Sequence, residues 1–249
     1  MKTILPKLYD IFVKEGFHPM SGYPSHRFFN IISAQFTTFM VQDRIIGDYG
    51  FSLQEIQFIE GFSEFLAPET ILVIGNAHGW STVALALIFP HANVVAIDTR
   101  QEGITFTNTL ARKNRLNIIA VQGRSPDDVQ TIFTNHCTTP LDLIVIDADH
   151  HIDSIVKDFF AVQSLMKDDG ILLFHDIIDH GLMPGFLDIL KNSKMHGRLL
   201  TRTSSGIGIA FRQIQEDFLS YINCFNDNPD DYHRYVNLMA KIAGVERPC

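Results

Sequence analysis

The sequence predicts an α/β protein with a doubly wound, mostly parallel sheet, an antiparallel hairpin at the C-terminal edge and an N-terminal helical cap. Three observations predict this fold class. Short apolar runs alternate with amphipathic helical patterns from about Ser52 onward, the first run breaks into a glycine-containing turn, and two strand-like runs after Pro184 lie close together. The 249 residues, of which 46% are hydrophobic, are enough for one full core.

Each element follows from a local pattern. Residues 1–51 are rich in Phe and lack the strand–helix alternation, so we expect a separate helical cap that contacts the substrate. Ser52 and Glu55 have the spacing of a capping box, which predicts a helix that Pro68 closes. The strands predicted next are Thr70–Ile74, Asn93–Ile97, Asn117–Val121, Leu141–Ile146 and Gly170–Phe174. The helices predicted between them are Ser81–Phe89, Gln101–Asn114, Pro126–Asn135 and Ile152–Met166.

In the C-terminal third of the sequence, the alternation of strands and helices is predicted to give way to a hairpin. A helical GFLDILKNS precedes GRLLTRT and IGIAFRQI, and the turn Ser204–Gly206 between these two runs favours a hairpin. The last predicted element is a helix that begins near Pro229. We therefore divide the chain into a cap (1–51), a cofactor-binding domain (52–213) and a C-terminal helical extension (214–249).

Composition excludes several classes of function. A net charge of -8 and a pI near 5.7 argue against a nucleic-acid partner. The N-terminal apolar segment is interrupted by Pro6, Lys7 and Asp10, which fits neither a signal peptide nor a membrane span. The three cysteines are widely spaced without a CxxC motif, as expected of reduced thiols: Cys137, Cys224 and Cys249. We expect a cytoplasmic protein that acts on a small molecule, and a homodimer formed through the cap is a further hypothesis.

The turn Gly75-x-x-x-Gly79-x-Ser81 follows the first strand and opens a helix. Glycine permits a tight turn and a close approach of a ligand to the free N–H groups of the helix. Asp98 ends the second strand, 23 positions after Gly75, where a carboxylate can accept the hydroxyl protons of a ribose. A plain β–α turn is the structural alternative, but the combination favours a nucleotide-like cofactor.

The order of these motifs resembles the class I S-adenosylmethionine-dependent methyltransferases, which have a Rossmann-like sheet, over roughly Ser52 to Arg212. The resemblance implies S-adenosylmethionine as cofactor, with these contacts: Gly75, Asn76, Gly79, Ser81, Asp98, Arg124, Ser125 and Asp147. Ser125 is also a strong N-cap. NAD is the competing cofactor, but Asn76 and Ala77 stand where a Gly-x-Gly-x-x-Gly loop would admit a pyrophosphate.

Two groups of acidic residues and histidines follow the fourth and fifth predicted strands. The first contains Asp147, Asp149, His150 and His151, and the second contains His175, Asp176, Asp179 and His180. Adjacent parallel strands end side by side, so we expect the two groups to converge. Carboxylates with some imidazole suit Mg²⁺ or Mn²⁺, and a set richer in imidazole suits Fe²⁺ or Zn²⁺. An exposed polar loop is the structural alternative.

The sequences IDADHH and GILLFHD resemble the metal-dependent O-methyltransferases of antibiotic and sugar tailoring, a group that includes cephalosporin-hydroxylase-like proteins, and the layout is similar to catechol O-methyltransferase. The resemblance implies metal binding by Asp147, His175 and Asp176. It also implies Asp149 as general base, with His150 in reserve, for O-methylation of a small-molecule hydroxyl. His175 can instead hydrogen-bond to a metal ligand and orient it without binding the metal itself.

One residue departs from the family pattern. Val73 stands two places before Gly75, where the family has an acidic residue that holds the amino-acid end of the cofactor. Asn76 or Asp48 are the candidates to replace it. Two alternative functions follow: a cofactor-binding protein of this fold without methyl transfer, and a metal-dependent reaction other than methyl transfer.

Overall fold

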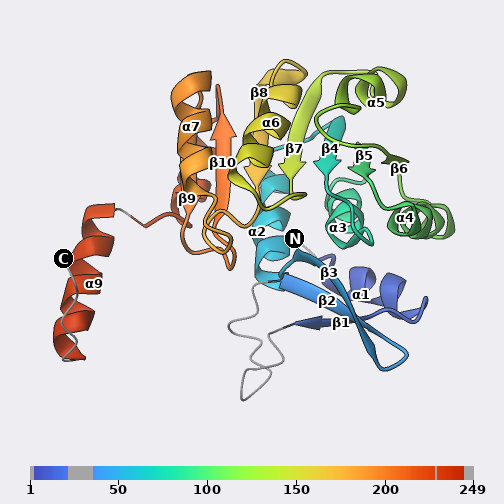
Figure 1. Cartoon of the computed structure of the whole chain (residues 1–249), viewed down its shortest axis with the longest axis horizontal. Helices are drawn as coiled ribbons and strands as arrows, with labels where there is room; N and C mark the ends of the chain where they lie inside the picture. The colour runs from blue at the N-terminus through green and yellow to red at the C-terminus, as the bar shows by residue number, and fades with distance from the viewer. Residues whose placement is uncertain (1–2, 22–35, 228, 244–249) are drawn as a thin grey trace.

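The computed structural model describes residues 3–21, 36–227 and 229–243, and a seven-stranded sheet forms its centre (Figure 1). The strands are β4 (Thr70–Ile74), β5 (Asn93–Asp98), β6 (Ile118–Gln122), β7 (Leu141–Ile146), β8 (Met166–Phe174), β9 (His196–Leu200) and β10 (Ile207–Phe211). Their order is β6-β5-β4-β7-β8-β10-β9, in which β4 to β8 are parallel and β10 is antiparallel to both β8 and β9. The predicted fold class, including the C-terminal hairpin, is confirmed.

Helices cover both faces of this sheet. The helices of the described residues are α1 (Leu5–Val13), α2 (Leu53–Glu60), α3 (Trp80–Ile88), α4 (Gln101–Asn114), α5 (Val129–His136), α6 (Ile152–Val162), α7 (Met183–Ser193), α8 (Glu216–Asn223) and α9 (Pro229–Ile242), of which α9 stands away from the sheet (Figure 1). All five residues of β4 are buried: Ile71 and Val73 pack in a cluster with α2, α3, α4 and α8, and Leu72 and Ile74 pack in a second cluster with α5, α6 and α7. A strand buried on both faces is typical of a doubly wound fold.

The prediction of a helical cap for residues 1–51 is wrong. Among its described residues this segment has one helix, α1, and a three-stranded antiparallel sheet of β1 (His18–Ser21), β2 (Phe36–Val41) and β3 (Arg44–Phe51). Gln42 and Asp43 both have left-handed φ values, of 48° and 61°, and form the two-residue turn of a hairpin between β2 and β3. Figure 1 shows this sheet beyond the carboxyl ends of β4, β5 and β7.

The N-terminal sheet is attached to α3 at the end of β3. The backbone N–H of Phe51 donates to Ser81 Oγ (3.1 Å), and the indole N–H of Trp80 donates to the Phe51 carbonyl (2.9 Å). The rings of Phe12 and Phe39 pack against Trp80, with centroids 5.1 and 5.8 Å from the indole. Phe residues whose number suggested helices therefore form an aromatic core between this sheet and α3.

Other differences from the predicted elements are small. β8 begins at Met166 rather than Gly170, because Met166 pairs with Leu141 ahead of a shift in register.

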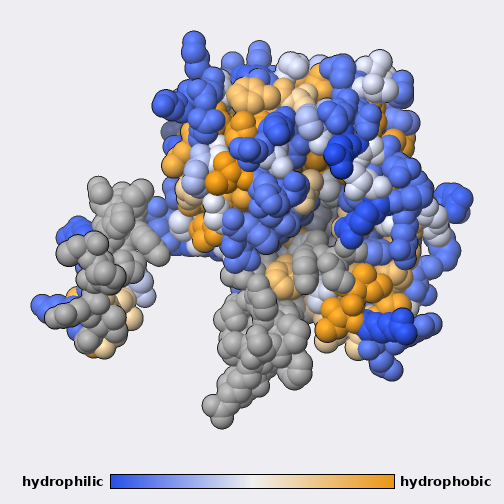
Figure 2. Space-filling model, viewed as in Figure 1, coloured by the Kyte–Doolittle hydropathy of each residue, from blue (hydrophilic) through white to orange (hydrophobic). Residues whose placement is uncertain are grey.

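A space-filling view shows apolar side chains gathered over the N-terminal sheet (Figure 2), where Met20 and Ile45 are exposed. No helix within the described residues is long and apolar enough to cross a membrane. The division of the chain into three domains stays a prediction.

Candidate active site

The turn between β4 and α3 requires both of its glycines. Gly75 has a φ of 95°, and a Cβ there would lie 1.9 Å from the carbonyl oxygen of Asp147. Gly79 has a φ of 83°, and a Cβ there would meet Thr107 of α4 at 2.3 Å. Only Gly75 faces a cavity, whereas Gly79 permits the close packing of α3 against α4. Gly79 thus acts on the cofactor site through the shape of the turn.

Asp98 closes this turn. Its Oδ2 accepts hydrogen bonds from the backbone N–H groups of Asn76 (2.9 Å) and Ala77 (2.7 Å), and its Oδ1 accepts one from Arg100 N (2.9 Å). A carboxylate has about four acceptor positions, so about one stays open at the cavity wall. Asp98 therefore organises the turn and retains room for one ligand hydroxyl.

Asn76 has a structural role in the same turn. Its Nδ2 donates to Ala77 O and to Thr107 Oγ1, both at 2.9 Å, and its Oδ1 accepts from Thr82 Oγ1 at 3.0 Å. Because both side-chain N–H groups are used inside the turn, they are not free to hold a cofactor. Val73 is fully buried in the core, and the side chain of Asp48 lies outside what the structure describes.

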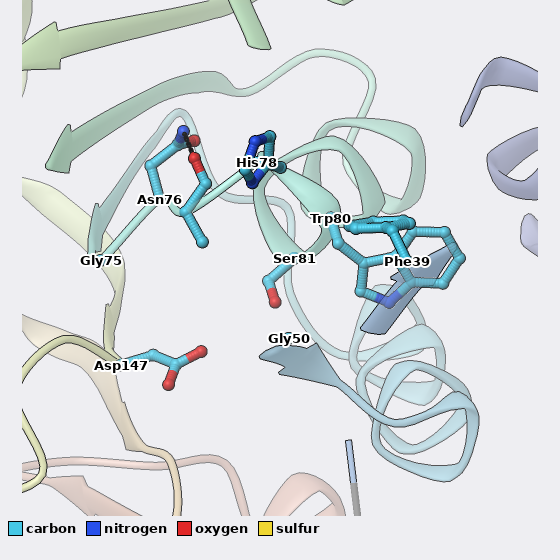
Figure 3. Close-up of a pocket in the computed structure, with 9 residues that line it drawn as sticks. Phe39, Gly50, Gly75, Asn76, His78, Trp80, Ser81 and Asp147 are labelled. Atoms are coloured by element: carbon cyan, nitrogen blue, oxygen red, sulfur yellow. Dashed lines mark hydrogen bonds between the residues drawn. The ribbon is translucent and has the colours of Figure 1, made fainter. Parts of the chain in front are cut away.

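Two cavities share walls at the carboxyl edge of the sheet. The smaller, of about 20 Å³, lies beneath the turn among Phe39, Trp80, Ser81 and Asp147 (Figure 3) and has room for about one water. The larger has a volume of about 930 Å³, which is in the range of ligand pockets. Of the predicted cofactor contacts, Asn76 and Ser81 line the smaller cavity. Those that line the larger one are Gly75, Asp98, Arg124, Ser125 and Asp147.

The ends of β7 and β8 bring three predicted metal ligands together. The Nδ1 atom of His175 lies 3.1 Å from Asp147 Oδ1 and 3.2 Å from Asp176 Oδ2. One donor atom from each of the three residues lies within 4.8 Å of the others. Burial lowers the pKa of His175, but the charges of Asp147, Glu55 and Asp176 raise it well above its ordinary value. Three carboxylates thus surround a buried imidazole.

Glu55 is a site residue that the sequence analysis treated only as a helix cap. The capping box with Ser52 is present, yet the fully buried carboxylate also lies 3.0 Å from His175 Nε2 and accepts the N–H and O–H of Ser205. Ser205 is 150 positions away in the turn before β10. The available signal was spacing: Glu55 precedes the buried Ile59 by four residues, which places a charge on the apolar face of α2.

His150 adds a second imidazole beside the carboxylates. Its Nε2 lies 3.1 Å from Asp176 Oδ2 and 3.8 Å from Asp147 Oδ1, and it is buried without a hydrogen bond of good geometry. The ring stacks on His180 with centroids 4.1 Å apart. Interaction with Asp147 and Asp176 raises the pKa of His150 to about 9. A buried ring nitrogen between two carboxylates is an arrangement that suits a shared cation.

Asp149, the predicted general base, points to a different set of partners. It is 62% exposed, accepts a hydrogen bond from Ser154 Oγ (2.8 Å) and lies 2.7 Å from His151 Nδ1 at the start of α6. These two hydrogen bonds lower the pKa of Asp149 below its ordinary value. A carboxylate with a lowered pKa is a weaker base, and Asp149 lies outside the cluster of Asp147, His175 and Asp176.

A methyltransferase-domain family model matches residues 72–177. The match covers less than half of the chain. The match begins within β4 and ends just after Asp176, so it includes the glycine turn, Asp98 and the ends of β7 and β8. The matched residues therefore contain most of the site described above, whereas Glu55 lies outside them.

Solved methyltransferase structures share the fold of this chain. An SAH-bound methyltransferase from Podospora anserina has 15% identity and a TM-score of 0.58, covering 86% of this chain and 89% of its own. The O-methyltransferase TomG from Streptomyces achromogenes, in complex with SAM, has 15% identity and a TM-score of 0.54, with coverage of 85% and 90%. An O-methyltransferase from Bacillus cereus, in complex with SAH, has 20% identity and a TM-score of 0.54, with coverage of 64% and 81%. The resemblance to class I methyltransferases is confirmed.

Proposed function

We propose that the protein transfers the methyl group of S-adenosylmethionine to a hydroxyl group of a small molecule, assisted by a divalent cation. One observation carries this proposal. A single cavity of about 930 Å³ extends from the glycine turn and Asp98 to the side chains of Asp147, His175 and Asp176. A cofactor held at the turn would thus present its methyl group beside the acidic cluster, where an acceptor hydroxyl would bind.

The turn supplies the groups that hold the cofactor. Asp98 retains an acceptor position for a ribose hydroxyl, and Gly75 leaves space above the sheet. Ser81 lies in the first turn of α3 and accepts from Phe51 N, so its own O–H is free to donate to the carboxylate of the amino-acid end. Because Val73 offers no acceptor, the amino group of the cofactor needs Asp147 or a backbone carbonyl.

The residues present fit a divalent cation. The donor set combines carboxylate oxygens of Asp147 and Asp176 with Nδ1 of His175. Oxygen ligands alone favour Mg²⁺, whereas the imidazole shifts the preference toward Mn²⁺ or another transition metal. Bound between these groups, the cation would lower the pKa of the acceptor hydroxyl.

Two residues would then position and move protons. With a cation bound in the cluster, Glu55 would accept the Nε2 proton of His175, which would leave the Nδ1 lone pair for the cation. His150 lies beside Asp176 at the cavity wall, and its raised pKa keeps it protonated near neutral pH. A cation bound to Asp147 and Asp176 would offset the charges that raise this pKa, and His150 would then take the proton of the acceptor. Asp149 lines the same cavity and is the second candidate for this role.

The acceptor would enter from the side of the N-terminal sheet, which lies beyond the carboxyl edge (Figure 1). The apolar surface of that sheet suits a small molecule with an aromatic or aliphatic part (Figure 2). A homodimer and a cytoplasmic location stay predictions.

The test is titration calorimetry with S-adenosylhomocysteine, once with EDTA and once with MnCl₂, followed by transfer of a labelled methyl group to a panel of phenols and sugars. We expect binding in both conditions and transfer only with metal. Binding without transfer to any hydroxyl would favour the cofactor-binding protein without methyl transfer. No binding in either condition would exclude the proposal.

A further inference from the structure

Asp158 is a buried carboxylate that the proposed reaction does not use. It lies on α6 with only 3% of its surface exposed, and its Oδ1 accepts a hydrogen bond of 2.6 Å from Ser125 Oγ in the loop after β6. Burial raises the pKa of Asp158, and the hydrogen bond from Ser125 offsets part of this effect. A charge held in this way is costly unless a further donor reaches it.

Asp158 lies in the wall of the larger cavity, at the end that the adenine would occupy. The loop after β6 is adjacent to Asp98, because Gly123 N donates to the Asp98 carbonyl at 2.9 Å. With the sulfonium near Asp147 and the ribose at Asp98, the base can only continue past this loop. Ser125, Pro126 and Asp158 line the cavity there.

The acceptor that Asp158 provides at this end of the cavity matches the donor on adenine, which is its 6-amino group. Among the described residues, the side chain of Asp158 receives one hydrogen bond, so the carboxylate has capacity for another donor. The 6-amino group of adenine is a donor, whereas a 6-oxo purine presents an oxygen at the same position. A carboxylate facing that oxygen would be repelled and would keep only the hydrogen bond from Ser125.

We propose that Asp158 accepts a hydrogen bond from the 6-amino group of adenine and so makes the site selective for adenine over a 6-oxo purine. This inference rests on the proposed cofactor. The neighbouring acidic residues are less suited to the role: Asp127 and Asp128 are exposed, and Asp128 Oδ2 already accepts from Arg124 N. A buried acceptor discriminates more strongly, because water cannot replace the missing donor.

The test compares S-adenosylhomocysteine and S-inosylhomocysteine, which differ at the 6-substituent and in the proton on the adjacent N1, by titration calorimetry with the full chain. We expect the wild type to bind the inosine compound about 10- to 100-fold more weakly, the value of one hydrogen bond to a charged group. Asp158→Asn can turn its amide N–H toward the cavity and donate to the 6-oxo group. Its ratio of affinities should therefore fall to near one or invert.

Asp153→Asn is the matched control, because Asp153 is exposed on the same helix. This variant should keep the wild-type ratio. Equal binding of both ligands by the wild type, or an unchanged ratio in Asp158→Asn, would overturn the inference while leaving the cofactor assignment intact. If the wild type binds neither ligand, the cofactor assignment fails and the inference fails with it.

Discussion

His175 Nε2 and Glu55 Oε2 lie 3.0 Å apart with both side chains buried. This contact joins the first turn of α2 to the residue that follows β8, 120 positions later in the chain. The same carboxylate oxygen accepts the backbone N–H of Ser52 at 2.9 Å. One oxygen atom therefore caps the N-terminal end of α2 and orients the imidazole at the centre of the candidate metal site.

Glu55→Ala should destabilise the protein by about 3–5 kcal/mol, because it leaves His175 buried beside two carboxylates without its partner on Nε2. Urea unfolding followed by circular dichroism measures the change. Glu64→Ala, at an exposed position in the short 3-10 helix Gly61–Glu64, should change the free energy of unfolding by less than about 0.5 kcal/mol. Equal effects of the two substitutions would contradict a special role for Glu55.

Asp147→Asn and Asp176→Asn should abolish stabilisation by metal, because each removes a charged oxygen from the cluster. Thermal unfolding with and without MnCl₂ or MgCl₂ is the measurement, and the wild type should gain more from Mn²⁺ than from Mg²⁺. Asp179→Asn is the control, since this carboxylate is nearby but exposed and outside the cluster. A wild-type unfolding temperature that neither metal changes would argue against a metal site.

His150→Gln should lower kcat by about 10² to 10⁴, the usual contribution of a general base. Asp149→Asn should lower it less than about tenfold, because Asp149 is exposed and bound to Ser154 and His151. Steady-state kinetics and the Kd of S-adenosylhomocysteine separate catalysis from binding, and the Kd should stay nearly constant. The reverse order of effects on kcat would restore Asp149 as the base.

Asp158→Asn should stabilise the cofactor-free protein at pH 7, because burial opposes the charged form of Asp158 and asparagine carries no charge. The pKa of Asp158 is raised in the folded state above its ordinary value of 3.8. Its contribution to stability is therefore present below about pH 3.8 and is lost as the pH rises through the folded-state pKa. The advantage of asparagine should shrink as the pH falls toward 4, and urea unfolding at several pH values checks this. A variant less stable than wild type at pH 7 would show that the charged carboxylate is well compensated.

The parallel sheet could be predicted because each strand is a continuous apolar run bounded by turn residues. The N-terminal segment could not be predicted, because its hairpin depends on left-handed backbone angles at Gln42 and Asp43. The sequence Gln-Asp does not indicate a two-residue hairpin turn as a glycine at either position would. Site residues at strand ends followed from parallel topology. Glu55 and Asp158 did not, since their partners His175 and Ser125 are 120 and 33 positions away and meet them only through tertiary packing.

Both backbone groups of Phe51 are bound to the first turn of α3, its N–H by Ser81 and its carbonyl by Trp80. The peptide that ends the N-terminal sheet is thus fixed to the helix that opens after the glycine turn. An exchange of residues 1–51 for those of another protein, intended to change the acceptor, would also disturb the cofactor pocket unless Phe51 keeps its backbone position. Acceptor choice and cofactor affinity in this chain should therefore be engineered together.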